Sequence, residues 1–196
     1  ILHARLTAAK GDLPAALARL DALITTDPSQ AEAFLVKGDL QQRGVKGATS
    51  SDPAAALASY RQAVKLRPNS VAAHSALLGL LFAQSEFEEA AKQLADLQKL
   101  SPKHPQTMYF EAMLAEHKGD SIKARELTQQ LLRIAPESGQ ILMLAGQVEA
   151  KLNNFSIAET HTAKAVQAMP KLVAPRRQLA TILLRTGQAD KALTAL

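Results

Sequence analysis

Prolines recur along this chain at a nearly constant interval. They are Pro28, Pro68, Pro102, Pro136 and Pro170. The first interval is 40 residues long, and each of the other three is 34 residues long. A fixed period of about 20 to 50 residues is typical of repeat proteins, whose units each pack on their neighbours alone. The chain is therefore expected to fold as stacked copies of one small structural unit.

Small residues follow the same period. Counting twelve residues back from each proline, and continuing the register once more, gives Ala16, Ala56, Ala90, Ala124, Ala158 and Ala192. A second position lies twelve residues before each of these alanines, except in the unit with the longer interval, where it lies six residues further back. It is occupied by Ala4, Gly38, Leu78, Ala112, Gly146 and Ala180. Small side chains allow two antiparallel helices to approach until ridges enter grooves. The pattern predicts a helix, a turn and a second helix in each unit.

The composition agrees with an all-helical fold. Ala and Leu are abundant, aromatic residues make up only 4% of the chain, and no Val, Ile or Thr run alternates with period two. Proline after each second helix ends it, because proline lacks the backbone N–H that the helix needs. Gly11, Gly119, Asn153 and Gly187 provide turns between the paired helices.

We expect one repeat array over residues 1–196, with units 1–28, 31–68, 71–102, 105–136, 139–170 and 171–196. The unit 31–68 carries six extra residues, which we place near 44–52 because this segment is rich in turn residues. Asp52 is predicted to cap the next helix, with Pro53 at its first position. Since the first and last units are partial, we expect a fragment of a longer repeat protein that self-associates through its uncapped ends.

These spacings and small residues resemble the tetratricopeptide repeat family over essentially the whole chain. The resemblance is weaker at the large positions, where the family favours Trp and this chain has Phe34, His74, Met108, Leu142 and Arg176. It implies an all-α fold, a right-handed α-solenoid, or superhelix, of helix-turn-helix repeats.

The resemblance also implies a concave groove lined by the first helix of each unit, in which a peptide or partner protein binds. The groove register gives Leu35, Asp39, Gln42, Ser75, Gly79, Phe82, Tyr109, Met113, Glu116, Met143, Gln147, Ala150, Arg177, Thr181 and Leu184. Phe82, Tyr109, Met113 and Met143 are candidate anchors for an amphipathic helix or an extended segment. Alternatively, these side chains pack between repeats.

The positive charge lies towards the C-terminal end. Residues 1–159 contain 17 Lys or Arg and 17 Asp or Glu, whereas residues 160–196 contain 6 and 1. Lys151, Arg176, Arg177 and Arg185 are the candidate basic patch. Such a patch could meet an anionic polysaccharide, and binding would then depend on ionic strength. The alternative is a hydrated helix surface without a partner.

Motifs for catalysis, cofactors and metals were not found in the sequence. It contains no Gly-rich phosphate loop or G-x-S-x-G turn, and its five histidines fall in separate repeats. Glu111, Glu116 and His117 form one local acid-base cluster, for which hydration or packing is the better interpretation. His74 occupies a packing position. We therefore expect no enzyme activity and no cofactor.

Three kinds of partner are disfavoured by the sequence. The longest apolar run, 76–83, is too short to cross a bilayer, so no membrane contact by this segment is expected. Aromatic residues are few and do not alternate with basic ones, which argues against nucleic acid. Repeats that clamp a C-terminal carboxylate carry Asn at positions where this chain has Asp39, Gly79, Met113, Gln147 and Thr181.

A narrower resemblance rests on three phrases, AKGDLPAALARLDALI, ILMLAGQVEAKLNNFSIAETHTAKAVQAMP and LVAPRRQLATILLRTGQADKAL. They look like the tetratricopeptide lipoprotein found with bacterial exosortase (PEP-CTERM) and exopolysaccharide gene clusters. This resemblance implies an envelope scaffold in polysaccharide export or surface-protein sorting, anchored by a lipidated cysteine outside the segment. A generic bacterial repeat protein is the rival interpretation. The function expected is a non-catalytic interaction scaffold, and the alternatives are an anionic polysaccharide module or the targeting domain of a larger enzyme.

Overall fold

The computed structural model describes residues 1–43 and 51–196. In these two ranges the regular structure consists of α-helices, twelve in number, which confirms the all-α solenoid of helical repeats. No described helix is long and apolar enough to cross a membrane. The predicted insertion near 44–52 falls mostly on residues outside the described ranges.

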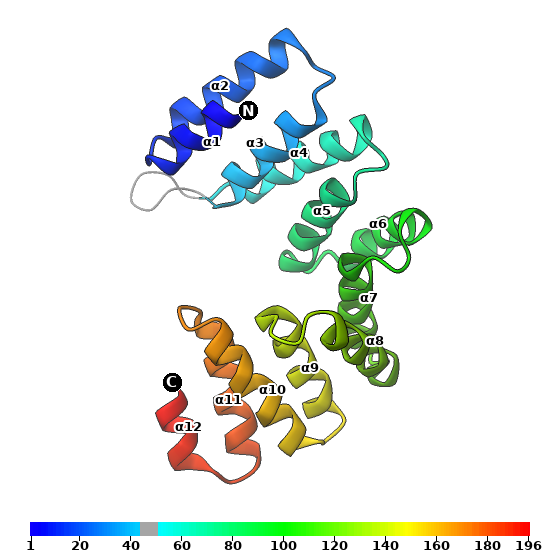
Figure 1. The fold of residues 1–196 in the computed structure, drawn as a ribbon, viewed down its shortest axis with the longest axis vertical. Coiled ribbons are helices and arrows are strands. Elements are labelled where there is room, and N and C mark those ends of the chain that lie inside the picture. Colours follow the sequence, from blue (N-terminus) through cyan, green and yellow to red (C-terminus); the bar gives the residue numbers. More distant parts are fainter. Residues whose placement is uncertain (44–50) are drawn as a thin grey trace. The chain divides into compact units, whose positions relative to one another are not determined.

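The described helices form two compact units, residues 1–102 and 103–196. The first unit contains α1 (Leu2–Ala9), α2 (Leu13–Thr26), α3 (Ala31–Arg43), α4 (Pro53–Leu66), α5 (Val71–Ala83) and α6 (Phe87–Leu100). The second contains α7 (Pro105–His117), α8 (Ser121–Ile134), α9 (Gly139–Lys151), α10 (Phe155–Ala168), α11 (Val173–Arg185) and α12 (Ala189–Ala195). Within each unit, successive helices pair as hairpins and pack on the next hairpin in chain order (Figure 1).

The second helix of several hairpins begins at an aspartate cap. The carboxylate of Asp12 accepts the N–H of Ala15 at 3.0 Å, and that of Asp52 accepts the N–H of Ala55 at 2.9 Å. Pro53 occupies the first turn of α4, where its missing N–H costs nothing. The predicted start of this helix is therefore confirmed.

The turns inside the hairpins use left-handed backbone conformations. Gly11, Gly119 and Gly187 have positive φ, as do Ser85 and Asn153 at the equivalent place in their own hairpins. Glycine and asparagine adopt this conformation most readily, which explains the predicted turn positions. Ser85 was not predicted, because serine is not a typical residue for this conformation.

The repeated alanines lie where the two helices of each hairpin cross. The first five, from Ala16 to Ala158, have no exposed surface, and Ala192 is 2% exposed. The small position of the first helix is buried as well, and even Leu78 is fully covered there. The predicted close approach of paired helices is confirmed.

Two glycines show how close this approach is. A Cβ atom on Gly38 would lie 2.6 Å from Cδ1 of Tyr60, and one on Gly146 would overlap the hydroxyl of Thr162. Gly146 lies against the backbone of Ala158, as predicted. At Gly38 the partner is instead the ring of Tyr60, so the missing side chain makes room for an aromatic residue rather than an alanine.

Gly38→Ala should lower the free energy of unfolding by about 1–3 kcal/mol, because its Cβ would push against the Tyr60 ring. Gly79 is the matched control, since it also lies inside a helix but has no atom within 4 Å of an added Cβ. Gly79→Ala should raise the free energy of unfolding by about 0.5–1 kcal/mol, as expected from helix propensity alone. Urea denaturation measures both, and an equal gain in the two variants would contradict the proposed close packing.

Candidate groove on the first helices

The predicted groove residues of the N-terminal unit differ in how far they are exposed. Leu35 and Asp39 on α3 are partly exposed, and Asp39 lines a cavity of about 420 Å³ between α1 and α3. Phe82 on α5 is only 9% exposed and packs edge-to-face on Phe87, with ring centroids 5.9 Å apart. In this unit the structure therefore places Asp39 at an open surface and Phe82 inside the fold.

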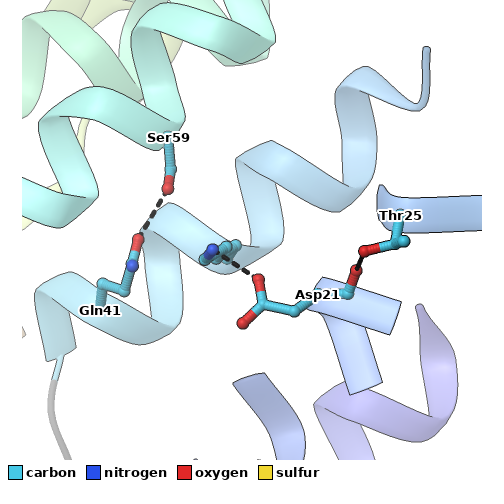
Figure 2. Close-up of polar contacts among 5 residues, drawn as sticks. Asp21, Thr25, Gln41 and Ser59 are labelled. Atoms are coloured by element: carbon cyan, nitrogen blue, oxygen red, sulfur yellow. Dashed lines mark hydrogen bonds and ion pairs between the residues drawn. The ribbon is translucent and has the colours of Figure 1, made fainter. Parts of the chain in front are cut away.

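Two polar side chains one turn apart fix α3 between its neighbours. Lys37 donates to the carboxylate of Asp21 on α2 at 2.5 Å, and Ser59 on α4 donates to Oε1 of Gln41 at 2.7 Å (Figure 2). The backbone oxygen of Asp21 also accepts the Thr25 hydroxyl at 2.8 Å. These bonds hold the helix that carries Leu35 and Asp39.

Tyr60 reaches the same groove surface from the second helix of the hairpin. Its ring lies over Gly38, and its hydroxyl contacts Oδ1 of Asp39 at 2.9 Å and Oε1 of Gln42 at 3.0 Å. Burial, followed by the negative charge of Asp39, raises the pKa of Tyr60 far above its usual value of 10.0. The phenol therefore stays protonated and orients the Asp39 carboxylate. Sequence reasoning missed Tyr60, although glycine at the small position was a signal for a large partner.

In the C-terminal unit, Tyr109 and Met113 on α7 are partly exposed. Both pack on a buried cluster around Ala112, Leu144 and Val148. Burial of the ring raises the pKa of Tyr109 above its usual value. Each side chain thus has an anchored part and an accessible part, and Met143 on α9 is likewise partly exposed.

A polar cluster joins α7 to α9. Glu116 is 8% exposed, and its carboxylate accepts Nε2 of Gln147 at 2.9 Å and forms an ion pair with Lys151. Lys151 also donates to the backbone oxygen of Glu116 at 3.2 Å. The structure therefore brings together three predicted residues, which bind one another across neighbouring first helices.

The predicted residues of α11 are the most exposed of the set. Arg177, Thr181 and Leu184 all face solvent, and Leu184 is 61% exposed. The hydroxyl of Thr181 donates to the backbone oxygen of Arg177 at 2.9 Å. Gln178, which the sequence did not single out, donates to the backbone oxygen of Met143 at 2.8 Å and so ties α11 to α9.

The candidate basic patch is partly satisfied inside the protein. Lys151 pairs with Glu116, and Arg176 donates to the backbone oxygen of Pro170 at 2.7 Å. The guanidinium of Arg185 lies 4.8 Å from the centre of the Phe155 ring, a favourable cation–π distance. Arg177 is exposed at the surface. Three of the four predicted basic residues therefore have a structural role as well.

One of the histidines has a clear role in packing. His74 is buried, where its Nε2 donates to the backbone oxygen of Pro68 at 2.7 Å and its Nδ1 accepts from Gln93. This confirms the packing interpretation of His74. Over residues 1–43 and 51–196, no three His, Cys, Asp or Glu side chains lie close enough together to hold a metal ion.

A buried carboxylate that the sequence did not reveal lies on α9. Glu149 forms an ion pair with Nε of Arg125 at 3.1 Å and accepts Nδ2 of Asn154 at 2.7 Å. It therefore connects the hairpin of α9 and α10 to α8. His161 on α10 is half-buried nearby. Burial lowers its pKa below the usual 6.5, the charge of Glu149 opposes this shift, and Lys164 adds to it.

The profile of the tetratricopeptide repeat family matches residues 48–105 and 80–139. The two matches together cover slightly less than half of the chain, and over this part its sequence is similar to tetratricopeptide repeats. No curated protein matches the chain in sequence.

Solved repeat structures resemble the chain in fold. A tetratricopeptide repeat protein from Parabacteroides merdae is 19% identical, with a TM-score of 0.74 over 100% of this chain and 75% of its own. PilW, a type IV pilus biogenesis factor, is 16% identical, with a TM-score of 0.78 over 99% of this chain and 87% of its own. The human IFIT1 dimer with m7Gppp-AAAA is 20% identical, with a TM-score of 0.75 over 93% of this chain and 44% of its own. At these identities the likeness shows the tetratricopeptide fold alone.

Stability should fall as His161 takes up a proton. Because its pKa is lower in the folded chain than the usual 6.5, the unfolded chain binds the proton first as the pH falls. The contribution of neutral His161 to the free energy of unfolding is therefore complete above pH 6.5 and is lost as the pH falls below it. Urea denaturation between about pH 7.5 and about pH 5.5 should show the decrease. His161→Gln should remove the part of this decrease in stability that comes from His161, whereas His3→Gln, at an exposed position, should leave the decrease as it is. An unchanged pH profile in His161→Gln would contradict this assignment.

Proposed function

We propose that this chain is a non-catalytic scaffold that binds a protein or peptide partner along its first helices. Tetratricopeptide repeats generally mediate protein–protein interactions, and the profile of that family matches residues 48–139. The observation that carries the proposal is the 420 Å³ cavity between α1 and α3, with Asp39 in its wall. A cavity of this volume is in the range of about 300–1,000 Å³ usual for binding sites.

In the C-terminal unit, considered by itself, the packing also leaves side chains of the first helices accessible. The second helices bury their repeated alanines against the first helices. On the first helices, Tyr109 and Met113 keep exposed atoms while they also pack against the core, and Met143 is partly exposed. Anchored aromatic and Met side chains suit a binding surface, because they bury a large area with little loss of conformational freedom.

We further propose a bacterial envelope setting, in exopolysaccharide export or surface-protein sorting, with a lipid anchor on the periplasmic side outside this segment. This proposal rests on the resemblance of the repeat sequences to the exosortase-associated lipoprotein. PilW, a protein with the same fold, is a pilus biogenesis factor. Self-association is proposed as well, because Leu2 on α1 and Leu193 on α12 expose most of their side chains.

An anionic polysaccharide is the second candidate partner, and the exposed Arg177 favours it. Lys151, Arg176 and Arg185 already have partners inside the protein. We therefore rank an anionic polysaccharide below a protein partner. The two candidates differ in salt dependence. Polysaccharide binding should weaken strongly between about 0.05 M and about 0.5 M salt, whereas binding through Tyr109 and Met113 should change little.

Replacing Tyr109 and Met113 together by Ala should weaken binding of the partner recovered from the native organism at least about tenfold, because central anchors carry most of the binding energy. Surface plasmon resonance with the purified partner measures the loss. Ile122→Ala is the matched control, since Ile122 is 60% exposed on the second helix α8 and should leave binding unchanged.

Because Tyr109 and Met113 also pack on the core, circular dichroism must show that the double variant remains folded. Gln147→Ala gives a second test at an exposed position of the same surface. Full binding by both the double variant and Gln147→Ala would contradict the proposed groove.

A further inference from the structure

We propose that the cavity between α1 and α3 binds an extended peptide at an internal acidic residue next to an apolar one. This inference rests on the proposed scaffold function and names the chemistry of one part of the partner. It concerns the N-terminal unit alone.

The cavity has an apolar wall made by both helices and the start of α2. Ala8, Ala9 and Leu13 line it on one side, and Val36 and Leu40 line it on the other. Leu13 and Val36 are themselves buried, so this wall is fixed by the core. The wall suits an aliphatic side chain, which is stabilised by leaving water.

Among the residues that the structure describes, three charged side chains line the same cavity, Arg5, Asp39 and Arg43. The two guanidinium groups come from different helices, and together with the carboxylate they give this described lining a net charge of +1. A carboxylate ligand would therefore be attracted, and guanidinium groups bind carboxylates through paired N–H donors.

Arg5 is available for such a ligand. It forms an ion pair with Glu32 at 3.7 Å, and the two side chains are 52% and 50% exposed. Ion pairs this exposed contribute little to stability, so an incoming carboxylate can replace Glu32 at low cost.

Asp39 favours a peptide over a simple anion. Tyr60 donates its hydroxyl to Oδ1 of Asp39 and so holds the carboxylate in place at the cavity wall. The second carboxylate oxygen of Asp39, Oδ2, can accept a hydrogen bond from a ligand, and the backbone N–H of an extended peptide is such a donor, whereas a simple anion has none. A continuing chain beyond the acidic residue supplies that N–H, which is why the acidic residue is assigned to the interior of a segment.

The test uses the full chain and fluorescence anisotropy with short amidated peptides that carry glutamate on both sides of one leucine. Matched peptides replace the glutamates by lysine or the leucine by serine. The acidic and apolar peptide should bind at least about tenfold more tightly than either, because one charge-assisted hydrogen bond or one buried aliphatic side chain contributes this much.

Variants then locate the site. Arg5→Gln and Arg43→Gln should each weaken binding about tenfold, while Arg19→Gln, at an exposed position on α2 outside the cavity, should not. Ala8→Leu should also weaken binding without changing any charge, because the larger side chain would occupy space in the cavity beside the apolar wall.

Four results with the peptides would overturn the inference. They are no binding of the acidic peptide at about 1 mM, equal binding of the lysine peptide, full binding by both arginine variants, and binding only of peptides that end in a free carboxylate next to the leucine. Tighter binding of single-stranded oligoadenylate that is lost in the arginine variants would overturn it too. If the native partner needs Tyr109 and Met113 but neither Arg5 nor Arg43, the scaffold function stands and this inference alone fails.

Discussion

The fold depends on the close approach of two helices in each hairpin. The repeated alanines of the second helix are buried against small residues of the first, and at Gly38 and Gly146 even a methyl group would not fit. Such an approach lets ridges of one helix enter grooves of the other. At Gly146 it brings the backbone of the neighbouring helix into contact, and at Gly38 it makes room for the Tyr60 ring.

This packing determines which surfaces remain for a partner. In each hairpin, the inner faces of the two helices pack against each other and are buried. Polar bonds then fix first helices to their neighbours. Asp21 and Lys37 hold α3 in the N-terminal unit, and Glu116 and Gln147 join α7 to α9 in the C-terminal unit. What remains is a surface of half-anchored side chains in each unit, which is rigid enough to bind a partner with little loss of entropy.

The fold could be predicted from the sequence because it is encoded locally. Proline, alanine and turn residues act within their own hairpin, so their spacing predicted the helices, the buried alanines and the cap at Asp52. The candidate site was harder. The register identified the helix and side of Phe82 and Glu116, but their burial depends on side chains of neighbouring elements, such as Phe87 and Lys151. Tyr60 escaped notice because it reaches Asp39 from a second helix, through space that Gly38 leaves empty.

Hydrogen exchange with and without the purified native partner tests the central claim most directly, because it reports protection helix by helix. The account predicts that the partner slows exchange in first helices, in α3 of the N-terminal unit or in α7 and α9 of the C-terminal unit. Exchange in the second helices α4, α8 and α10 should change little. Protection confined to those second helices would contradict the account, since the partner would then bind the opposite surface of the hairpins.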